Sequence, residues 1–386
     1  MSFINNMAGS LGGLLFGLAA FLFVLSIVVF VHEMGHFLVA RWCGVKVSAF
    51  SLGFGPEIYG FDDKHGTRWR FAWIPLGGYV KFMDDENGAS MPMKDRLEKM
   101  TPEERAVSFH GKPLWQKAAV VAAGPIANFL LAIAIFAFLF MTIGVTTIPP
   151  RVDAVIPGSV AERAGFKSGD LIVSINGKSV DAFQQLQQSV NDNVGSELTF
   201  GVDRAGQIVT LKATPELSEV ADGLGGKAKM GKIGVQLPAK PQDLRHKTYG
   251  PIDSVVMGVE KSYGIVRSTF AYLSNVITGR QSADQLGGPV RIANASGKIA
   301  KMGLDQLVYF VAFISVSLGL VNLFPVPILD GGHLTFYAIE ALRGKPLNED
   351  TQEMAFRVGF GLIMALMLFA FWNDRFILLG WLPGSG

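Results

Sequence analysis

Residues 11–37 read LGGLLFGLAAFLFVLSIVVFVHEMGHF, an apolar run that ends in two histidines and a glutamate. Leu11 to Val31 include no charged residue, and about 20 mainly apolar residues are enough for a helix to cross a bilayer. No Lys or Arg precedes the run and no small-residue cleavage site follows it. We therefore expect a retained membrane span rather than a secretory signal.

The rest of the chain has the composition of a membrane protein. Of its 386 residues 49% are hydrophobic and 17% charged, against about 25% charged in a soluble domain, which excludes a disordered or collagen-like chain. Three further apolar stretches follow: Ala118–Pro150, Gln306–Leu329 and Val358–Asn373, the last continued by Phe376–Leu382. The sequence predicts a polytopic α-helical membrane protein with four transmembrane helices.

The distribution of positive charge predicts the orientation of these spans. The tail before the first span has no Lys or Arg, whereas residues 41–117 have twelve. Loops rich in Lys and Arg tend to stay in the cytoplasm, so we expect residues 41–117 inside and both termini and residues 151–305 outside. The net charge of +2 and the lack of a Lys/Arg-rich tract argue against a nucleic-acid partner. The single cysteine, Cys43, excludes an internal disulfide.

The end of the first span carries the candidate chemistry. His32, Glu33 and His36 form the pattern H-E-x-x-H on an apolar helix. Residues four apart share one helical face, so both imidazoles can bind one Zn²⁺, and the adjacent glutamate can act as a general base toward water. Ionisable groups inside a span are costly, so this cluster indicates function rather than structure.

A third ligand is expected near the end of the third span. A catalytic zinc site takes three protein ligands and keeps one position open. Asp330 is the first charge after 24 uncharged residues, and the first and third spans run in the same direction, so it reaches the same side as His36. Asp330 could also cap a helix beside the Pro/Gly turn, and the two roles are compatible.

Two neighbours of Asp330 have open interpretations. Asn322 either makes a helix-to-helix hydrogen bond or donates to a substrate backbone or an oxyanion. His333 either supports the metal ligands through a hydrogen bond or caps a helix at the cytoplasmic side.

The pair H-E-M-G-H and N-L-F-P-V-P-I-L-D-G-G-H, residues 32–36 and 322–333, resembles the site-2 protease family of intramembrane zinc metalloproteases. The likeness is to its bacterial branch, which cleaves anti-sigma factors. The family's G-P-x-x-N element is matched in the second span by residues 124–128. The resemblance implies one Zn²⁺ per chain and these roles: metal ligands His32, His36 and Asp330; catalytic base Glu33; substrate positioning by Asn322, Pro327, Gly77 and Gly78; support of the ligands by His333 and Asn128.

Residues 45–83 are expected to form a β-hairpin. Val45–Tyr59 and Arg68–Phe82 are rich in aromatic and β-branched residues and flank a turn at residues 62–66. In the family the corresponding hairpin folds back into the membrane beside the zinc, and Pro75–Lys81 looks like its edge strand, which can pair with an extended peptide. The alternative is a small cytoplasmic subdomain with the aromatics as its core.

The outer segment resembles a PDZ domain. Ala164–Gly177 closely matches the signature stretch of that family, and short alternating strands surround it, so we expect one periplasmic α+β PDZ domain at about 151–237. Bacterial relatives often carry two in tandem. The groove of such a domain can capture a peptide carboxyl terminus. Equally, the domain could exclude substrates with bulky outer domains.

Apolar residues recur at helical spacing in residues 251–278, which predicts an amphipathic helix there. This helix could lie on the outer membrane surface or against the PDZ domain. The expected organisation is as follows: 1–40, first span; 41–117, cytoplasmic segment; 118–148, second span; 151–237, PDZ domain; 250–300, amphipathic helix and linker; 305–333, third span; 355–382, fourth span and carboxyl terminus.

The expected function is hydrolysis of a peptide bond in or near the transmembrane segment of a single-span protein already shortened by another protease. The resemblance implies a multi-pass protein of the bacterial inner membrane that acts in regulated intramembrane proteolysis, with its active site toward the cytoplasm. Two other classes are a membrane-anchored PDZ receptor with a structural or inactive metal site, and a metal transporter. The transporter is disfavoured because His65, His110 and His246 form no relay along a span.

Overall fold

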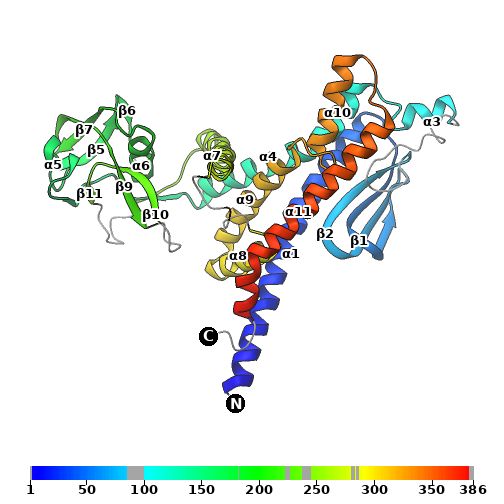
Figure 1. Ribbon diagram of the computed structural model, residues 1–386, viewed down its shortest axis with the longest axis horizontal. Coiled ribbons are helices and arrows are strands. Elements are labelled where there is room, and N and C mark those ends of the chain that lie inside the picture. Colours follow the sequence, from blue (N-terminus) through cyan, green and yellow to red (C-terminus); the bar gives the residue numbers. More distant parts are fainter. Residues whose placement is uncertain are drawn as a thin grey trace. The chain divides into compact units, whose positions relative to one another are not determined.

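The computed structural model describes residues 2–84, 100–180, 182–221, 227–236, 245–279, 283 and 287–381. The chain forms two compact units, one of residues 1–139 with 250–386 and one of residues 140–249 (Figure 1). The expected linker at 286–289, the end of the expected PDZ domain at 237 and the end of the fourth span at 382 fall partly outside the described residues.

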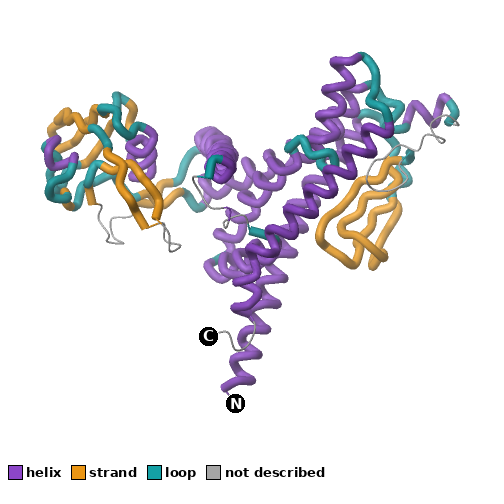
Figure 2. Tube along the Cα trace, viewed as in Figure 1, coloured by secondary structure: helices purple, strands orange, loops and turns teal. Residues whose placement is uncertain are grey.

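Four helices of the larger unit are long and apolar enough to cross a membrane. They are α1 (Ser2–Trp42), α4 (Leu114–Thr142), α9 (Leu304–Asn322) and α11 (Glu349–Trp381). All four coincide with the predicted apolar stretches, so the prediction of a polytopic helical protein is confirmed. Figure 2 shows how strongly helix dominates this unit.

The spans end earlier than the apolar stretches do. The second stretch was expected to continue to Pro150, but α4 ends at Thr142 and Gly144 adopts a left-handed φ of 76°. The third was expected to reach Leu329, but α9 ends at Asn322. Helices stop where glycine and proline break the hydrogen-bond ladder, so apolar composition alone overestimates their length.

Two helices of the larger unit fall in segments expected to be linker or span end. Helix α8 (Pro289–Met302) packs against α1, α9 and α11, and α10 (Asp330–Arg343) follows the turn after α9. A Cβ on Gly297 of α8 would lie 2.7 Å from Cα of Gly17 in α1. Glycine at this crossing therefore allows the two helices to approach closely. A short helix, α3 (Pro102–Val107), precedes α4.

Helix α7 (Pro251–Ile277) matches the predicted amphipathic helix, with a different packing face. Its buried residues are Ser254, Gly258, Ser262 and Ile265, and a Cβ on Gly258 would lie 2.9 Å from the carbonyl oxygen of Ile133 in α4. The apolar Val255, Val259 and Tyr263 are exposed. The helix therefore packs mainly through small side chains, and these three apolar side chains stay exposed.

The predicted hairpin is a four-segment sheet made from two bent strands, β1 (Val47–Asp62) and β2 (Arg68–Phe82). Residues 57–62 pair antiparallel with 68–72, residues 49–52 lie beside 68–71, and residues 47–52 pair antiparallel with 78–82. The segment 78–82 is thus an edge of this sheet among the described residues. Phe50 and Trp69 pack on Phe37 of α1, whereas Phe71 and Trp73 are exposed. The aromatics thus only partly form a core.

The smaller unit is an α+β fold with its own apolar core. Its four-stranded antiparallel sheet has the order β6-β5-β7-β8, from Lys178–Ser179, Leu171–Ile175, Leu198–Arg204 and Gln207–Ala213. Helices α5 (Val160–Ala164) and α6 (Phe183–Asp192) accompany the sheet. The remaining strands form three pairs. They are β3 (Val145–Thr147) with β12 (Arg245–Lys247), β4 (Ala154–Val155) with β11 (Val235–Gln236), and β9 (Glu216–Ala221) with β10 (Lys227–Lys232).

Candidate metal centre and active site

Helix α1 presents His32 and His36 on one face. The two residues are one turn apart, and their rings meet edge-on with centroids 4.8 Å apart. Gly35 lies between them, where a Cβ would be 2.3 Å from the carbonyl oxygen of Ala123 in α4. The missing side chain therefore allows α4 to lie directly against the histidine-bearing turn of α1.

Asp330 is the first residue of α10, which begins after the turn that follows α9. Gly331 and Gly332 make this turn possible, because a Cβ on either would lie within 2.4 Å of backbone atoms of residues 323–327. Leu329 occupies the N-cap position and makes no side-chain capping bond. The Asp330 side chain does not act as the N-cap and points instead toward α1.

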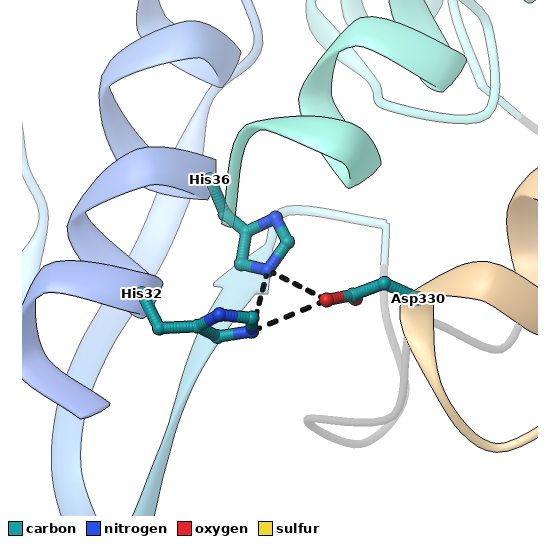
Figure 3. A group of neighbouring side chains, drawn as sticks. All are labelled: His32, His36 and Asp330. Atoms are coloured by element: carbon teal, nitrogen blue, oxygen red, sulfur yellow. Dashed lines mark hydrogen bonds and ion pairs between the residues drawn. The ribbon is translucent and has the colours of Figure 1, made fainter. Parts of the chain in front are cut away.

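The three predicted ligands converge from these two elements (Figure 3). Oδ2 of Asp330 lies 3.2 Å from Nε2 of His32 and 3.5 Å from Nε2 of His36, and the two Nε2 atoms are 3.3 Å apart. Ligands about 2.0–2.2 Å from a tetrahedral zinc are separated by about 3.3–3.6 Å. The cluster therefore has the separations that a zinc ion requires.

Hydrogen bonds on the far sides of both rings leave Nε2 free to bind a metal. Nδ1 of His36 is 2.8 Å from the carbonyl oxygen of Val120, so Nδ1 carries the proton and Nε2 the lone pair. Nδ1 of His32 is 3.2 Å from the side-chain amide of Asn128, whose Oδ1 is buried without a partner. Turning this amide by 180° lets Oδ1 accept from Nδ1–H of His32, which satisfies both groups and fixes the same tautomer.

Gly124 forms one wall of the cluster. A Cβ at this position would lie 2.2 Å from Nε2 of His36 and 2.9 Å from Cε1 of His32. Position 124 of α4 therefore tolerates only glycine. Together with Oδ2 of Asp330, which is buried without a well-formed hydrogen bond, this tight arrangement fits a cation bound between the three residues.

The cluster opens into a cavity of about 380 Å³ that Glu33 also lines. Gly77, Gly78, Asn322 and His333 line it as well. Nδ2 of Asn322 is 3.2 Å from Nε2 of His32. A Cβ on Gly78 would lie 2.9 Å from Cγ of Glu33, so the sheet edge approaches the glutamate closely.

Of the two remaining predicted site residues, His333 lines the cavity and Pro327 does not. Pro327 packs against Gly332 and Gly359 and is not among the residues that line the cavity. His333 lies in the lining, and its ring contacts Phe356 of α11 at a centroid distance of 5.4 Å. The sequence did not single out Val120 or Gly124 individually. Val120 acts through its carbonyl group, which no residue type reveals, whereas Gly124 was signalled by the G-P-x-x-N element.

The model of peptidase family M50 matches residues 20–366, nearly the whole chain. The chain belongs to peptidase family M50. A Rhizobium meliloti protein named "Putative zinc metalloprotease" is 50% identical over 97% of this chain and 99% of its own length. Metalloprotease MmpA of Caulobacter vibrioides is 38% identical over 94% of this chain and 96% of its own. Protease RseP of Yersinia pestis is 33% identical over 94% of this chain and 98% of its own length.

Membership of family M50 makes this chain a zinc metalloprotease of the site-2 type. The expected family and enzyme class are thus confirmed. A comparison with solved structures matches a PDZ domain of an SdrC-like protein from Listeria monocytogenes. The match covers 24% of this chain and 90% of that domain, with 20% identity and a TM-score of 0.19.

Proposed function

We propose that this family M50 protease hydrolyses a peptide bond in or near the transmembrane segment of single-span membrane proteins. The observation that carries the proposal is that the metal cluster lies between elements of candidate membrane helices, since His32 and His36 belong to α1 and Asp330 follows α9. We infer that one Zn²⁺ per chain binds there. When bound, zinc polarises both water and the scissile carbonyl as a Lewis acid.

Glu33 is proposed as the general base. Its carboxylate lines the cavity that also contains the three ligands, so it can take a proton from the attacking water and pass it to the leaving amine. Asn128 and the Val120 carbonyl hold the two imidazoles in the tautomer that directs Nε2 inward. Asn322, whose Nδ2 lies 3.2 Å from Nε2 of His32, is proposed to donate a hydrogen bond to the substrate backbone.

Substrate is proposed to bind as an extended strand along residues 78–82. A transmembrane helix keeps its carbonyls in internal hydrogen bonds, so a peptide must unwind locally before hydrolysis. Residues 78–80 of this edge line the cavity, and their backbone is proposed to supply donors and acceptors to such a peptide. Gly77 and Gly78 let the strand lie close to Phe54 and to Glu33, where a Cβ would come within 2.5 Å and 2.9 Å, and are proposed to position substrate in this way. Pro327 is assigned an indirect role through the turn that carries Asp330.

The cellular setting follows from the same proposal. We assign the chain to the bacterial inner membrane, with both termini periplasmic and the metal toward the cytoplasm, because residues 41–117 carry twelve Lys and Arg. Anti-sigma factors shortened by an earlier protease are the proposed substrates. The smaller unit is proposed to be a PDZ domain that either binds peptide termini or excludes large outer domains.

The proposal is tested by mapping the cut. The full-length protein, reconstituted with zinc in lipid, is incubated with a tagged single-span substrate lacking its outer domain, and the products are sized by mass spectrometry. We expect one main cut within or next to the apolar segment, none with Glu33→Gln, and slower cleavage when a folded outer domain is restored. Cleavage only in soluble loops, or equal cleavage by Glu33→Gln, would contradict the proposal.

A further inference from the structure

The sheet edge beside the metal ends in a buried carboxylate that the chemistry above does not use. Asp84 lies two residues beyond Phe82, and its side chain is fully buried. Oδ1 accepts a hydrogen bond from the backbone N–H of Phe109 at 3.0 Å. Oδ2 accepts from the backbone N–H of His110 at 2.9 Å and lies 2.8 Å from His110 Nδ1. Burial raises the pKa of Asp84, but these hydrogen bonds outweigh it and lower the pKa to about 2.

The same contact joins the strand to the scaffold of the metal site. Phe82 stacks on Phe109 with ring centroids 4.6 Å apart, and both residues line the cavity. Residues 108–112 directly precede α4, whose Val120 carbonyl and Gly124 contact the histidines. Asp84 therefore connects the end of the edge strand to the segment that leads into the histidine-supporting helix.

We propose that Asp84 and His110 form a clamp that fixes the register of the edge strand 78–82 relative to the metal, and thereby selects which peptide bond of the substrate is cut. Asp84 is a positioning residue, since it reaches the reacting atoms only through the strand. The inference rests on the proposed function, because it requires substrate to pair with this edge.

Strand geometry explains why such a clamp matters. A slip of one residue moves the strand by about 3.3 Å and turns every side chain to the opposite face. Pairing with residues 47–52 sets the register of this strand. Hydrogen bonds at 2.8–3.0 Å cannot follow a movement of that size, so the three contacts to Asp84 hold the end of the strand in that register. In this proposal, a substrate strand that pairs with the cavity-lining residues 78–80 is aligned by the position of the edge strand, which sets the scissile carbonyl opposite the metal.

The test compares cleavage positions in the full-length, zinc-loaded protein reconstituted in lipid. Four variants are used: Asp84→Ala, Asp84→Asn as the milder isostere, His110→Ala, and His110→Asn, whose amide can still donate to Asp84. The matched control is Asp170→Asn, which alters another buried, hydrogen-bonded carboxylate in the smaller unit. Bound zinc, KM, kcat and product masses are measured for each.

We expect Asp84→Ala to keep its zinc, to lose about tenfold to a hundredfold in kcat/KM, and to cut at additional positions one or two residues from the original. Asp84→Asn and His110→Ala should do so to a smaller extent, whereas His110→Asn and Asp170→Asn should keep the original cut. Should Asp84→Ala fold poorly, Asp84→Asn provides the same readout.

Two results would overturn the clamp. One is an unchanged single cut in every Asp84 variant, with activity reduced only in proportion to folded protein, which would make Asp84 merely structural. The other is loss of zinc in Asp84→Asn, which would place its effect at the metal instead of the strand. Failure of the wild-type protein to cut a single-span substrate would instead refute the proposed function, so the two failures are distinguishable.

Discussion

The two units of the chain surround a carboxylate with different partners. In the smaller unit, Asp170 is buried and receives hydrogen bonds from Nε and Nη2 of Arg204 at 2.8 Å each, along with the backbone N–H of Lys167. In the larger unit, Oδ2 of Asp330 lies 3.2 Å and 3.5 Å from Nε2 of His32 and His36, and the Val120 carbonyl holds His36 in the tautomer whose lone pair is on Nε2. The first carboxylate has a permanent cation of its own.

This difference separates a structural charge from a functional one. A buried carboxylate with its own guanidinium is satisfied by the fold. A half-buried carboxylate that shares a cluster with two imidazole nitrogens matches the ligand set of a bound zinc ion. We therefore expect the site of the larger unit to depend on zinc, whereas the smaller unit has an internal ion pair.

The largest effect is expected for Asp330→Ala. Removal of one of three ligands should lower zinc occupancy from about one per chain to near zero and abolish cleavage, because two histidines bind zinc weakly. Metal analysis and cleavage of a single-span substrate measure this. If the variant kept its zinc and lost only thermal stability, Asp330 would belong with Asp170 and the contrast between the units would be wrong.

Gly124→Ala should have the next largest effect. Its Cβ would collide with Nε2 of His36, so we expect zinc affinity to fall about 10- to 100-fold, as with changes to outer-shell contacts. Competition with a chelator measures the affinity. Gly361→Ala is the matched control, since no atom lies within 4 Å of a Cβ at that position in α11. Equal zinc affinities in both variants would show that α4 does not confine the histidines.

Asn128→Ala should weaken zinc binding by about 10-fold, at the lower end of the range for outer-shell partners. His32 would lose the acceptor for Nδ1–H, whereas Asn128→Asp retains an acceptor oxygen and should bind zinc as well as the wild-type protein. The same chelator titration measures both. Weak binding by Asn128→Asp would show that the amide donates to Nδ1, which contradicts the tautomer assigned to His32.

Asp170→Asn should have the smallest effect on cleavage and a local effect on stability. We expect a loss of about 2 kcal/mol, typical of hydrogen bonds to charged groups. Hydrogen exchange in strands β5 and β7 of the full chain measures it. A loss of zinc in this variant would remove the distinction between the units.

The pH dependence of the smaller unit provides a further check. Hydrogen bonds from Arg204 lower the pKa of Asp170 in the folded protein, and burial only partly opposes them. Its contribution to stability is therefore complete above the unfolded pKa of about 3.9 and is lost as the pH falls through the lower folded value. After correction for the intrinsic exchange rate at each pH, amide hydrogens of β5 in the wild-type protein should exchange faster as the pH falls below about 4. The same acceleration should be much smaller in Asp170→Asn.

The sequence predicted the ligands better than it predicted the shape that holds them. His32, His36 and Asp330 could be named because H-E-x-x-H spacing and an intramembrane charge have specific chemical meanings. The helix ends at Thr142 and Asn322 were overestimated, since apolarity does not encode where a helix stops.

The missed features depend on the backbone and on tertiary contacts. The two bent strands of the hairpin form four segments joined by three pairings, a pattern that alternation along β2 does not reveal. Helix α8 was interpreted as linker because its stability comes from packing on α1 rather than from its own sequence. The Val120 carbonyl gave no signal because every residue carries one.

The central claim is that His32, His36 and Asp330 hold a zinc ion at which Glu33 acts as base. The most direct measurement combines zinc content and cleavage in purified wild type and Glu33→Gln. The account predicts about one zinc per chain in both proteins, with cleavage reduced at least 100-fold in Glu33→Gln, since general acid–base catalysis contributes about 10²- to 10⁴-fold. Cleavage by Glu33→Gln at the wild-type rate, or a wild-type protein that cleaves without binding zinc, would contradict it.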